Sequence, residues 1–150
     1  MAYIKYKEIT KYFYFSQAVG IASLPKYVND YKYDDEFFLV GYRTSRDYGV
    51  FTSQRILLFD NWGMKKEVTS VPYENISSCS VVFGVGGADL SMMLDSGYPM
   101  RIKFVKIDDI GKKRLRLIYS CIIRAMSDRK MRPEDVRMLT QDDISLAPKK

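Results

Sequence analysis

Apolar residues in the middle of the chain follow a period of two, which predicts β-strands. Met100, Ile102 and Phe104 occupy every second position. The residues between them, Arg101 and Lys103, are charged, as expected where one strand face meets a core and the other meets water. Turns rich in Gly, Asn, Asp, Ser and Pro separate further runs of this kind. The predicted strands are Glu36–Arg43, Arg46–Thr52, Arg55–Asn61, Lys65–Val71, Ile76–Phe83, Ala88–Asp95 and Met100–Ile107.

Two of these runs include four consecutive apolar residues. Phe37–Val40 and Ile56–Phe59 are continuously apolar, so we expect strands that are covered on both faces. The cover is either a flank of the chain or another subunit. Seven short strands at spacings of about ten residues indicate a sandwich or a small barrel.

The apolar period changes after Ile107. Over Asp108–Met126 the apolar residues form a stripe with spacings of one, three and four, which predicts a helix. Asp108 stands where a helix N-cap is favoured, and Pro133 stands where a second short helix over Glu134–Leu139 would begin. We therefore expect one long C-terminal helix followed by a short one.

The first 33 residues differ from the rest in composition. They contain seven of the twelve tyrosines, together with Phe13 and Phe15. We expect a helix over about residues 8–20. These aromatic side chains could stack on bases, but packing on the barrel or on a neighbouring subunit is the favoured interpretation. The interface candidates are Tyr12, Phe13, Phe15 and Phe37.

The predicted domain organisation has three parts. Residues 1–33 form the aromatic-rich N-terminal flank, residues 34–127 form the β-rich domain with its helix, and residues 128–150 form a C-terminal extension. The net charge of +6 is unevenly distributed along the chain. It is +3 over residues 1–33, −1 over residues 34–107 and +4 over residues 108–150. Any contact with a polyanion is therefore expected at the two flanks.

Seven strands followed by one helix is also the element order of a pleckstrin-homology barrel. Between Glu36 and Met126 the chain resembles the bacterial pleckstrin-homology domain family. The residues and motifs that support the resemblance are Arg46-Asp47, Phe51-Thr52, Arg55, Asp60, Gly63, Lys65-Lys66, Pro72-Tyr73, Ile76 and Asp89-Leu90. One departure is the segment Val82–Gly87, which lacks the acidic residue expected there and is richer in glycine.

The resemblance implies a fold and a general role. It implies a mainly β seven-stranded barrel capped at one end by its C-terminal helix. It also implies a binding or scaffolding module without catalytic apparatus, and some members of the family assemble into homo-oligomeric rings. It does not imply phosphoinositide binding, which belongs to eukaryotic relatives.

The residue inventory gives little support to catalysis or metal binding. The chain has no histidine, and its two cysteines, Cys79 and Cys121, cannot form a zinc site alone. The segment Gly84–Asp89 lacks the third glycine of a dinucleotide loop and precedes a strand, so a hairpin turn is expected there. We predict no catalytic residue, no metal and no cofactor.

Three arginines are the best candidates for binding an anion. They are Arg43, Arg46 and Arg55, of which Arg46 lies in the predicted loop between the first two strands. The alternative is structural, since Asp47 or another nearby carboxylate would neutralise Arg46 and fix the hairpin.

The leading hypothesis is a non-enzymatic binding or scaffold module that self-associates and also binds an unknown protein partner. A second hypothesis is a peripheral binder of anionic lipid through the basic flanks. A third is an accessory protein that binds a nucleotide or nucleic acid. The longest apolar stretch near the N-terminus, Ala18–Leu24, is too short to span a membrane, and a reducing compartment suits two cysteines, so we expect a cytoplasmic protein.

Overall fold

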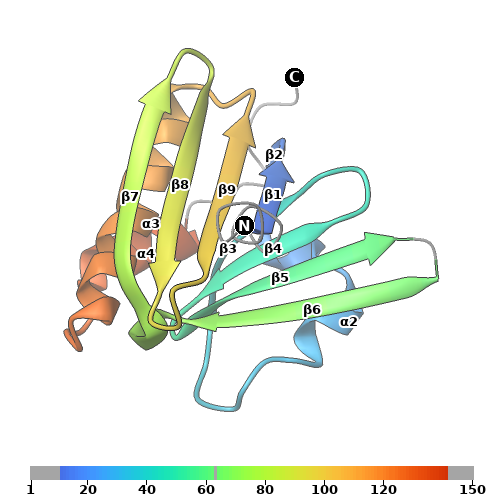
Figure 1. Cartoon of the computed structure of the whole chain (residues 1–150), viewed down its shortest axis with the longest axis horizontal. Coiled ribbons are helices and arrows are strands. Elements are labelled where there is room, and N and C mark those ends of the chain that lie inside the picture. The colour runs from blue at the N-terminus through green and yellow to red at the C-terminus, as the bar shows by residue number, and fades with distance from the viewer. Residues whose placement is uncertain (1–10, 63, 142–150) are drawn as a thin grey trace, which may run out of the picture.

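The computed structural model describes residues 11–62 and 64–141, which form two β-sheets and a pair of C-terminal helices (Figure 1). The strands are β1 Lys11–Phe15, β2 Gln17–Val19, β3 Phe38–Arg43, β4 Tyr48–Thr52, β5 Arg55–Trp62, β6 Lys65–Pro72, β7 Ile76–Gly84, β8 Gly87–Leu94 and β9 Pro99–Val105. The α-helices are α2 Lys26–Asn29, α3 Asp109–Met126 and α4 Pro133–Gln141, and single 3₁₀ turns span Ile21–Ser23 and Tyr73–Asn75. One sheet has the strand order β1-β9-β8-β7, and the other has the order β2-β3-β4-β5-β6.

All seven strands predicted from the middle of the chain are present, as β3 to β9. The long helix is confirmed as α3, and its N-cap is Asp108, whose side chain accepts a hydrogen bond from the backbone N–H of Gly111 at 2.8 Å. The second helix, α4, begins at Pro133 as expected. The glycine-rich segment is confirmed as a hairpin turn between β7 and β8, in which Gly86 has a φ of 73°.

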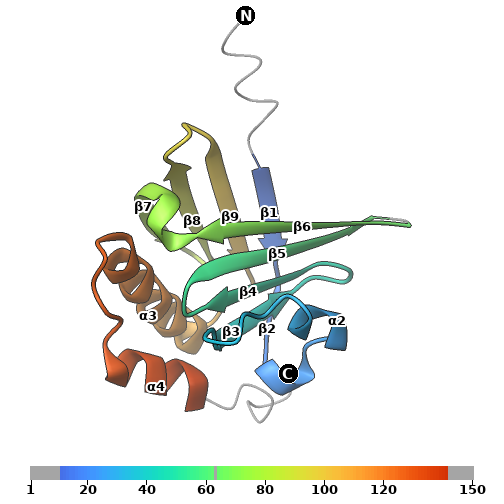
Figure 2. The ribbon, with the colours of Figure 1, turned by 90° about the horizontal axis from the view of Figure 1, so that it is seen from below.

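The helix predicted over residues 8–20 is wrong wherever the structure describes that segment, because residues 11–15 and 17–19 are strands. β1 pairs in parallel with β9, and β2 pairs antiparallel with β3, so the N-terminal segment joins the two sheets (Figure 2). Phe13 and Phe15 point into the core while Tyr14 between them is exposed, which is the period of a strand. Residues 8–10 of the predicted helix lie outside the described residues.

The main core lies between the two sheets and α3. Phe15 packs against Tyr42 and Phe104, with ring centroids 6.1 Å apart in both pairs. A β-carbon at Gly49 would lie 2.4 Å from the Phe15 ring, so β4 needs a glycine where this ring crosses it. The N-terminal strand is thus part of the core and not an appendage to it.

A second apolar cluster lies on the opposite face of the five-stranded sheet. Leu24 and Val28 of the N-terminal segment pack there against Leu57 and Phe59 of β5. The alternate residues of β5, Ile56 and Leu58, belong to the main core. The expectation that this strand is covered on both faces is confirmed, and its cover is the flank of the same chain.

We expect the side chain of Phe15 to contribute strongly to folding, unlike that of its neighbour. Phe15→Ala should lower the free energy of unfolding by about 3–5 kcal/mol, because it leaves a cavity between the sheets. Tyr14→Ala, on the exposed face of the same strand, should cost less than about 1 kcal/mol. Urea denaturation of both variants measures the difference, and equal losses would contradict the placement of β1 in the sheet.

Candidate functional site

Exposed aromatic side chains gather on the segment between α2 and β3. We call residues 31–37 the aromatic strap. Its side chains Tyr31, Tyr33 and Phe37 are 45%, 51% and 46% exposed. Large aromatic residues are usually more buried than this, and three in one short segment indicate a surface that contacts another molecule.

A buried ion pair fixes the strap to the five-stranded sheet. Arg55, the first residue of β5, donates from Nε to Oε2 of Glu36 at 2.9 Å and from Nη2 to Oε1 at 3.1 Å. The same guanidinium donates to the carbonyl of Tyr31 and to Oγ of Ser70. The ring of Tyr33 lies 3.8 Å from the guanidinium carbon. Arg55 therefore holds the strap by its backbone, its carboxylate and one of its aromatic rings.

The carboxylate of Glu36 is satisfied on both oxygens. The hydroxyl of Thr52 donates to Oε2 at 2.5 Å, and the backbone N–H of Tyr33 donates to Oε1 at 3.0 Å. Burial alone would raise the pKa of Glu36, but the hydrogen bonds from Arg55, Thr52 and Tyr33 hold the pKa below its ordinary value. The site therefore holds a charged carboxylate in the interior of the molecule.

The strap is anchored at its far end as well. The backbone N–H of Phe37 donates to Oγ of Ser53 at 3.1 Å, and the N–H of Ser53 donates to the carbonyl of Phe37 at 2.8 Å. At the other end, the ring of Tyr31 packs edge-on against Phe59 at 5.5 Å. The exposed rings thus project from a backbone that is already ordered, which lowers the entropic cost of binding.

The three arginines predicted to bind an anion do not form one site. Arg43 is the last residue of β3. It pairs with Tyr48 of β4, and Tyr48 pairs in turn with Phe59 of β5. Phe59 is four residues along β5 from Arg55, or about 13 Å at the rise of a strand. The structure separates Arg55 from the other two and commits it to Glu36.

Arg46 occupies the loop between β3 and β4, where it lies near two carboxylates. Its Nε is 3.3 Å from Asp47, and its Nη2 is 3.6 Å from Asp60. Asp47 also accepts a hydrogen bond from the N–H of Asn61 at 2.9 Å, which ties this loop to the end of β5. The contacts of Arg46 match the structural alternative.

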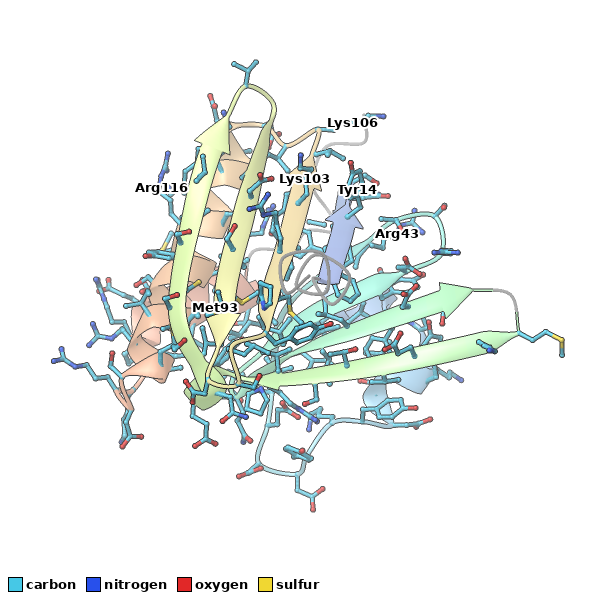
Figure 3. The ribbon with its side chains drawn as sticks, in the orientation of Figure 1. Tyr14, Arg43, Met93, Lys103, Lys106 and Arg116 are labelled. Carbon is cyan, nitrogen blue, oxygen red and sulfur yellow. The ribbon has the colours of Figure 1, made fainter. Side chains whose placement is uncertain are left out.

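A second surface is basic. Lys103 of β9 and Lys106 just after it lie on the same side of the molecule as Arg43 and Tyr14 (Figure 3). Within residues 11–62 and 64–141, no carboxylate forms an ion pair with Lys103, Lys106 or Arg43. We call Arg43, Lys103 and Lys106 the basic face. The Nε of Arg43 donates to Oε1 of Gln17 at 3.0 Å, and Asp89 of β8 is the cross-strand partner of Lys103.

The interface candidates divide into buried and exposed residues. Phe13 and Phe15 are 5% and 1% exposed, so they pack on the barrel itself. Packing on the barrel was one of the two expected alternatives, the other being a neighbouring subunit. Phe37 is exposed on the strap, and the side chain of Tyr12 lies outside the described part. Tyr31, Tyr33 and Glu36 were not among the predicted site residues, although the cluster of tyrosines near the N-terminus was an available signal.

The cysteines are poor nucleophiles in this fold. Burial raises the pKa of the Cys79 thiol to about 12 and that of Cys121 to about 11, so both stay protonated near neutral pH. Among the described residues, no group of three His, Cys, Asp or Glu side chains is placed to hold a metal ion. No helix in the described part of the chain is long and apolar enough to cross a membrane.

The family of the chain follows from a match to the family model described as "Bacterial PH domain", which covers residues 4–126. The chain belongs to this family, whose members are typically non-enzymatic binding modules. The match includes β1 and β2 and ends at the last residue of α3. No curated protein matches the chain.

Solved structures of similar fold are bacterial pleckstrin-homology proteins. One from Shewanella loihica is 22% identical with a TM-score of 0.59, over 74% of this chain and 98% of that one. One from Exiguobacterium sibiricum is 17% identical with a TM-score of 0.59, over 75% and 63%. A domain from Shewanella amazonensis is 23% identical with a TM-score of 0.54, over 74% and 91%. At these identities the similarity shows the fold alone.

We expect the Arg55–Glu36 pair to make stability depend on pH. Because the pKa of Glu36 is lowered by folding, its stabilising contribution is complete above the ordinary value of 4.5 and is lost as pH falls through the lower folded-state value. Glu36→Gln should cost about 3–5 kcal/mol near neutral pH, because Arg55 is left buried without its carboxylate. The variant should also lose part of the acid sensitivity of the wild-type chain.

Denaturation at a series of pH values from about 7 to 3 measures both effects. Glu74→Gln is the matched control, because Glu74 is an exposed residue of the 3₁₀ turn after β6, and it should leave stability close to wild type. If the free energy of unfolding of Glu36→Gln changed with pH as much as that of the wild type, the role of the carboxylate would be contradicted.

Proposed function

We propose that the chain is a non-enzymatic binding module that assembles with copies of itself through the aromatic strap. The observation that supports this most directly is the exposure of Tyr31, Tyr33 and Phe37 on a backbone already fixed by Arg55 and Ser53. Rigid aromatic side chains are the residues that dominate the energy of protein interfaces. About half of each side chain remains exposed and available to a partner.

The charge around the strap favours one arrangement of copies over another. Asp30, Asp34 and Asp35 lie on or beside the strap and outnumber Lys32. Two straps facing each other across a two-fold axis would bring these carboxylates together. The basic face of another copy offers opposite charge, so we propose a contact from the strap of one copy to the basic face of the next.

Such a contact is heterologous, since it joins two different surfaces. A pair of copies then has one free strap and one free basic face left, so further copies can add until a ring closes. We further propose that assembly takes place in the cytoplasm, because Cys79 and Cys121 are free thiols.

We expect Phe37→Ser to weaken self-association without loss of folding. The variant removes an exposed aromatic ring, so the dissociation constant should rise by about tenfold or more. Size-exclusion chromatography with light scattering over a range of concentrations measures this change. Met64→Ser is the control, because Met64 is fully exposed on the turn between β5 and β6 and belongs to neither surface.

Charge reversal provides the second arm of the same experiment. The Lys106→Glu variant should have a lower native mass than the wild type, to a degree similar to Phe37→Ser. Raised salt should lower the native mass of the wild type in the same way. A wild-type chain that stays monomeric at every concentration would contradict the proposal, as would equal effects of the Phe37 and Met64 variants.

A second candidate function is the binding of an anionic membrane surface by the basic face. Lys103, Lys106 and Arg43 lie on one side of the molecule without ion pairs to described carboxylates, which supports this alternative. Sedimentation with vesicles of phosphatidylserine and phosphatidylcholine should then show binding that depends on the anionic lipid and on low salt. Equal binding to vesicles of pure phosphatidylcholine would contradict it, and Lys103→Glu should reduce any specific binding.

A further inference from the structure

The strand at the free edge of the four-stranded sheet lacks the charged residues and proline that usually protect an edge strand. β7 has nine residues, Ile76–Gly84, and contains no charged residue and no proline. By contrast, the edge strand β6 of the other sheet contains Lys65, Lys66, Glu67 and Pro72, and its edge strand β2 has only three residues. Long uncharged edges readily accept another strand, so natural proteins usually block them.

The hydrogen-bond pattern of the β7–β8 hairpin identifies the backbone groups that point outward at this edge. Gly84 pairs with Gly87 across a two-residue turn, and such a pair is hydrogen bonded. Antiparallel pairs alternate, so the N–H and C=O groups of Cys79, Val81 and Phe83 point away from β8. The hydroxyl of Tyr119 donates to the carbonyl of Cys79 at 3.2 Å, which agrees with that direction. No described strand pairs with β7 on this side.

Helix α3 forms a basic wall along the same edge. The guanidinium of Arg116 lies 5.3 Å from the centre of the Phe83 ring, and Figure 3 shows Arg116 beside the outer edge of β7. Lys112 precedes Arg116 by one helical turn and therefore shares its face of α3. Neither Lys112 nor Arg116 forms an ion pair with a carboxylate among residues 11–62 and 64–141.

From this geometry we infer that β7 binds an extended, acidic segment of a partner protein as an added strand. Backbone groups of Val81 and Phe83 would pair with the segment, and its carboxylates would meet Lys112 and Arg116. A second copy of β7 is a poor occupant. Two-fold pairing would bring the cations of both α3 helices to one shared edge, and β7 has no carboxylate to neutralise them. The edge is separate from the aromatic strap, so the inference does not depend on self-association.

Binding is tested with three labelled peptides of equal length. One alternates valine with glutamate, the second alternates valine with lysine, and the third is the glutamate peptide with proline in place of valine. Fluorescence anisotropy should show binding of the first alone, since the second has the wrong charge and the third cannot donate backbone hydrogen bonds. Arg116→Glu should weaken binding at least tenfold, whereas Lys130→Glu, an exposed basic residue in the loop before α4, should not.

Amide hydrogen exchange followed by NMR locates the bound strand. The amides of Val81 and Phe83 should exchange quickly in the free protein and become protected when the glutamate peptide is added. The amides of Ser80 and Val82, which face β8, should be protected in both states. Failure of the glutamate peptide to bind, or binding without new protection at Val81 and Phe83, would overturn the inference. Protection that rises with protein concentration alone would also overturn it, because a second copy would then occupy the edge.

Discussion

A buried arginine–carboxylate pair holds the candidate surface of this molecule together. Arg55 and Glu36 have side-chain exposures of 7% and 0%, and their geometry is bidentate. A buried ion pair contributes little net stability compared with apolar residues of the same volume, but removing one partner is costly. Its consequence here is positional, since it fixes where the chain between α2 and β3 must run. The exposed rings of the strap project from that fixed path.

The pair acts together with a second apolar cluster. Leu24 and Val28 cover Leu57 and Phe59 on the outside of the five-stranded sheet, so the N-terminal segment is an outer layer of the fold. β1 and β2 join that layer to both sheets by pairing with β9 and β3. The N-terminal segment therefore connects the barrel, its outer cover and the exposed strap in one continuous path.

The sequence predicted the parts of the fold whose patterns are local. Period-two alternation and turn residues defined β3 to β9, and the helical stripe with Asp108 defined α3. The N-terminal strands were missed because aromatic residues occupy both faces of β1 in the sequence, and only pairing with β9 distinguishes Phe15 inside from Tyr14 outside. Partners that lie far away in the sequence decide that segment.

The candidate site was only partly predictable for the same reason. Arg55 was identified as important, but its partner Glu36 lies nineteen residues earlier, and no local pattern joins them. Glu36 stands just before the apolar run Phe37–Val40, and Arg55 stands just before the run Ile56–Phe59. This shared position was the available signal that the two residues pair. Phe37 was predicted as an interface residue, and the structure places it exposed at the start of its run, next to an irregular pairing between β3 and β4.

A photo-crosslinking residue at position 37 tests most directly whether the strap contacts another copy of the chain. A benzophenone side chain there replaces one exposed ring and leaves the Arg55–Glu36 pair intact. Illumination should give a covalent product of two chains, with the link in the second chain near Arg43, Lys103 or Lys106. Illumination that gives only single chains, over concentrations at which the unmodified protein is assembled, would contradict a role of the strap in assembly.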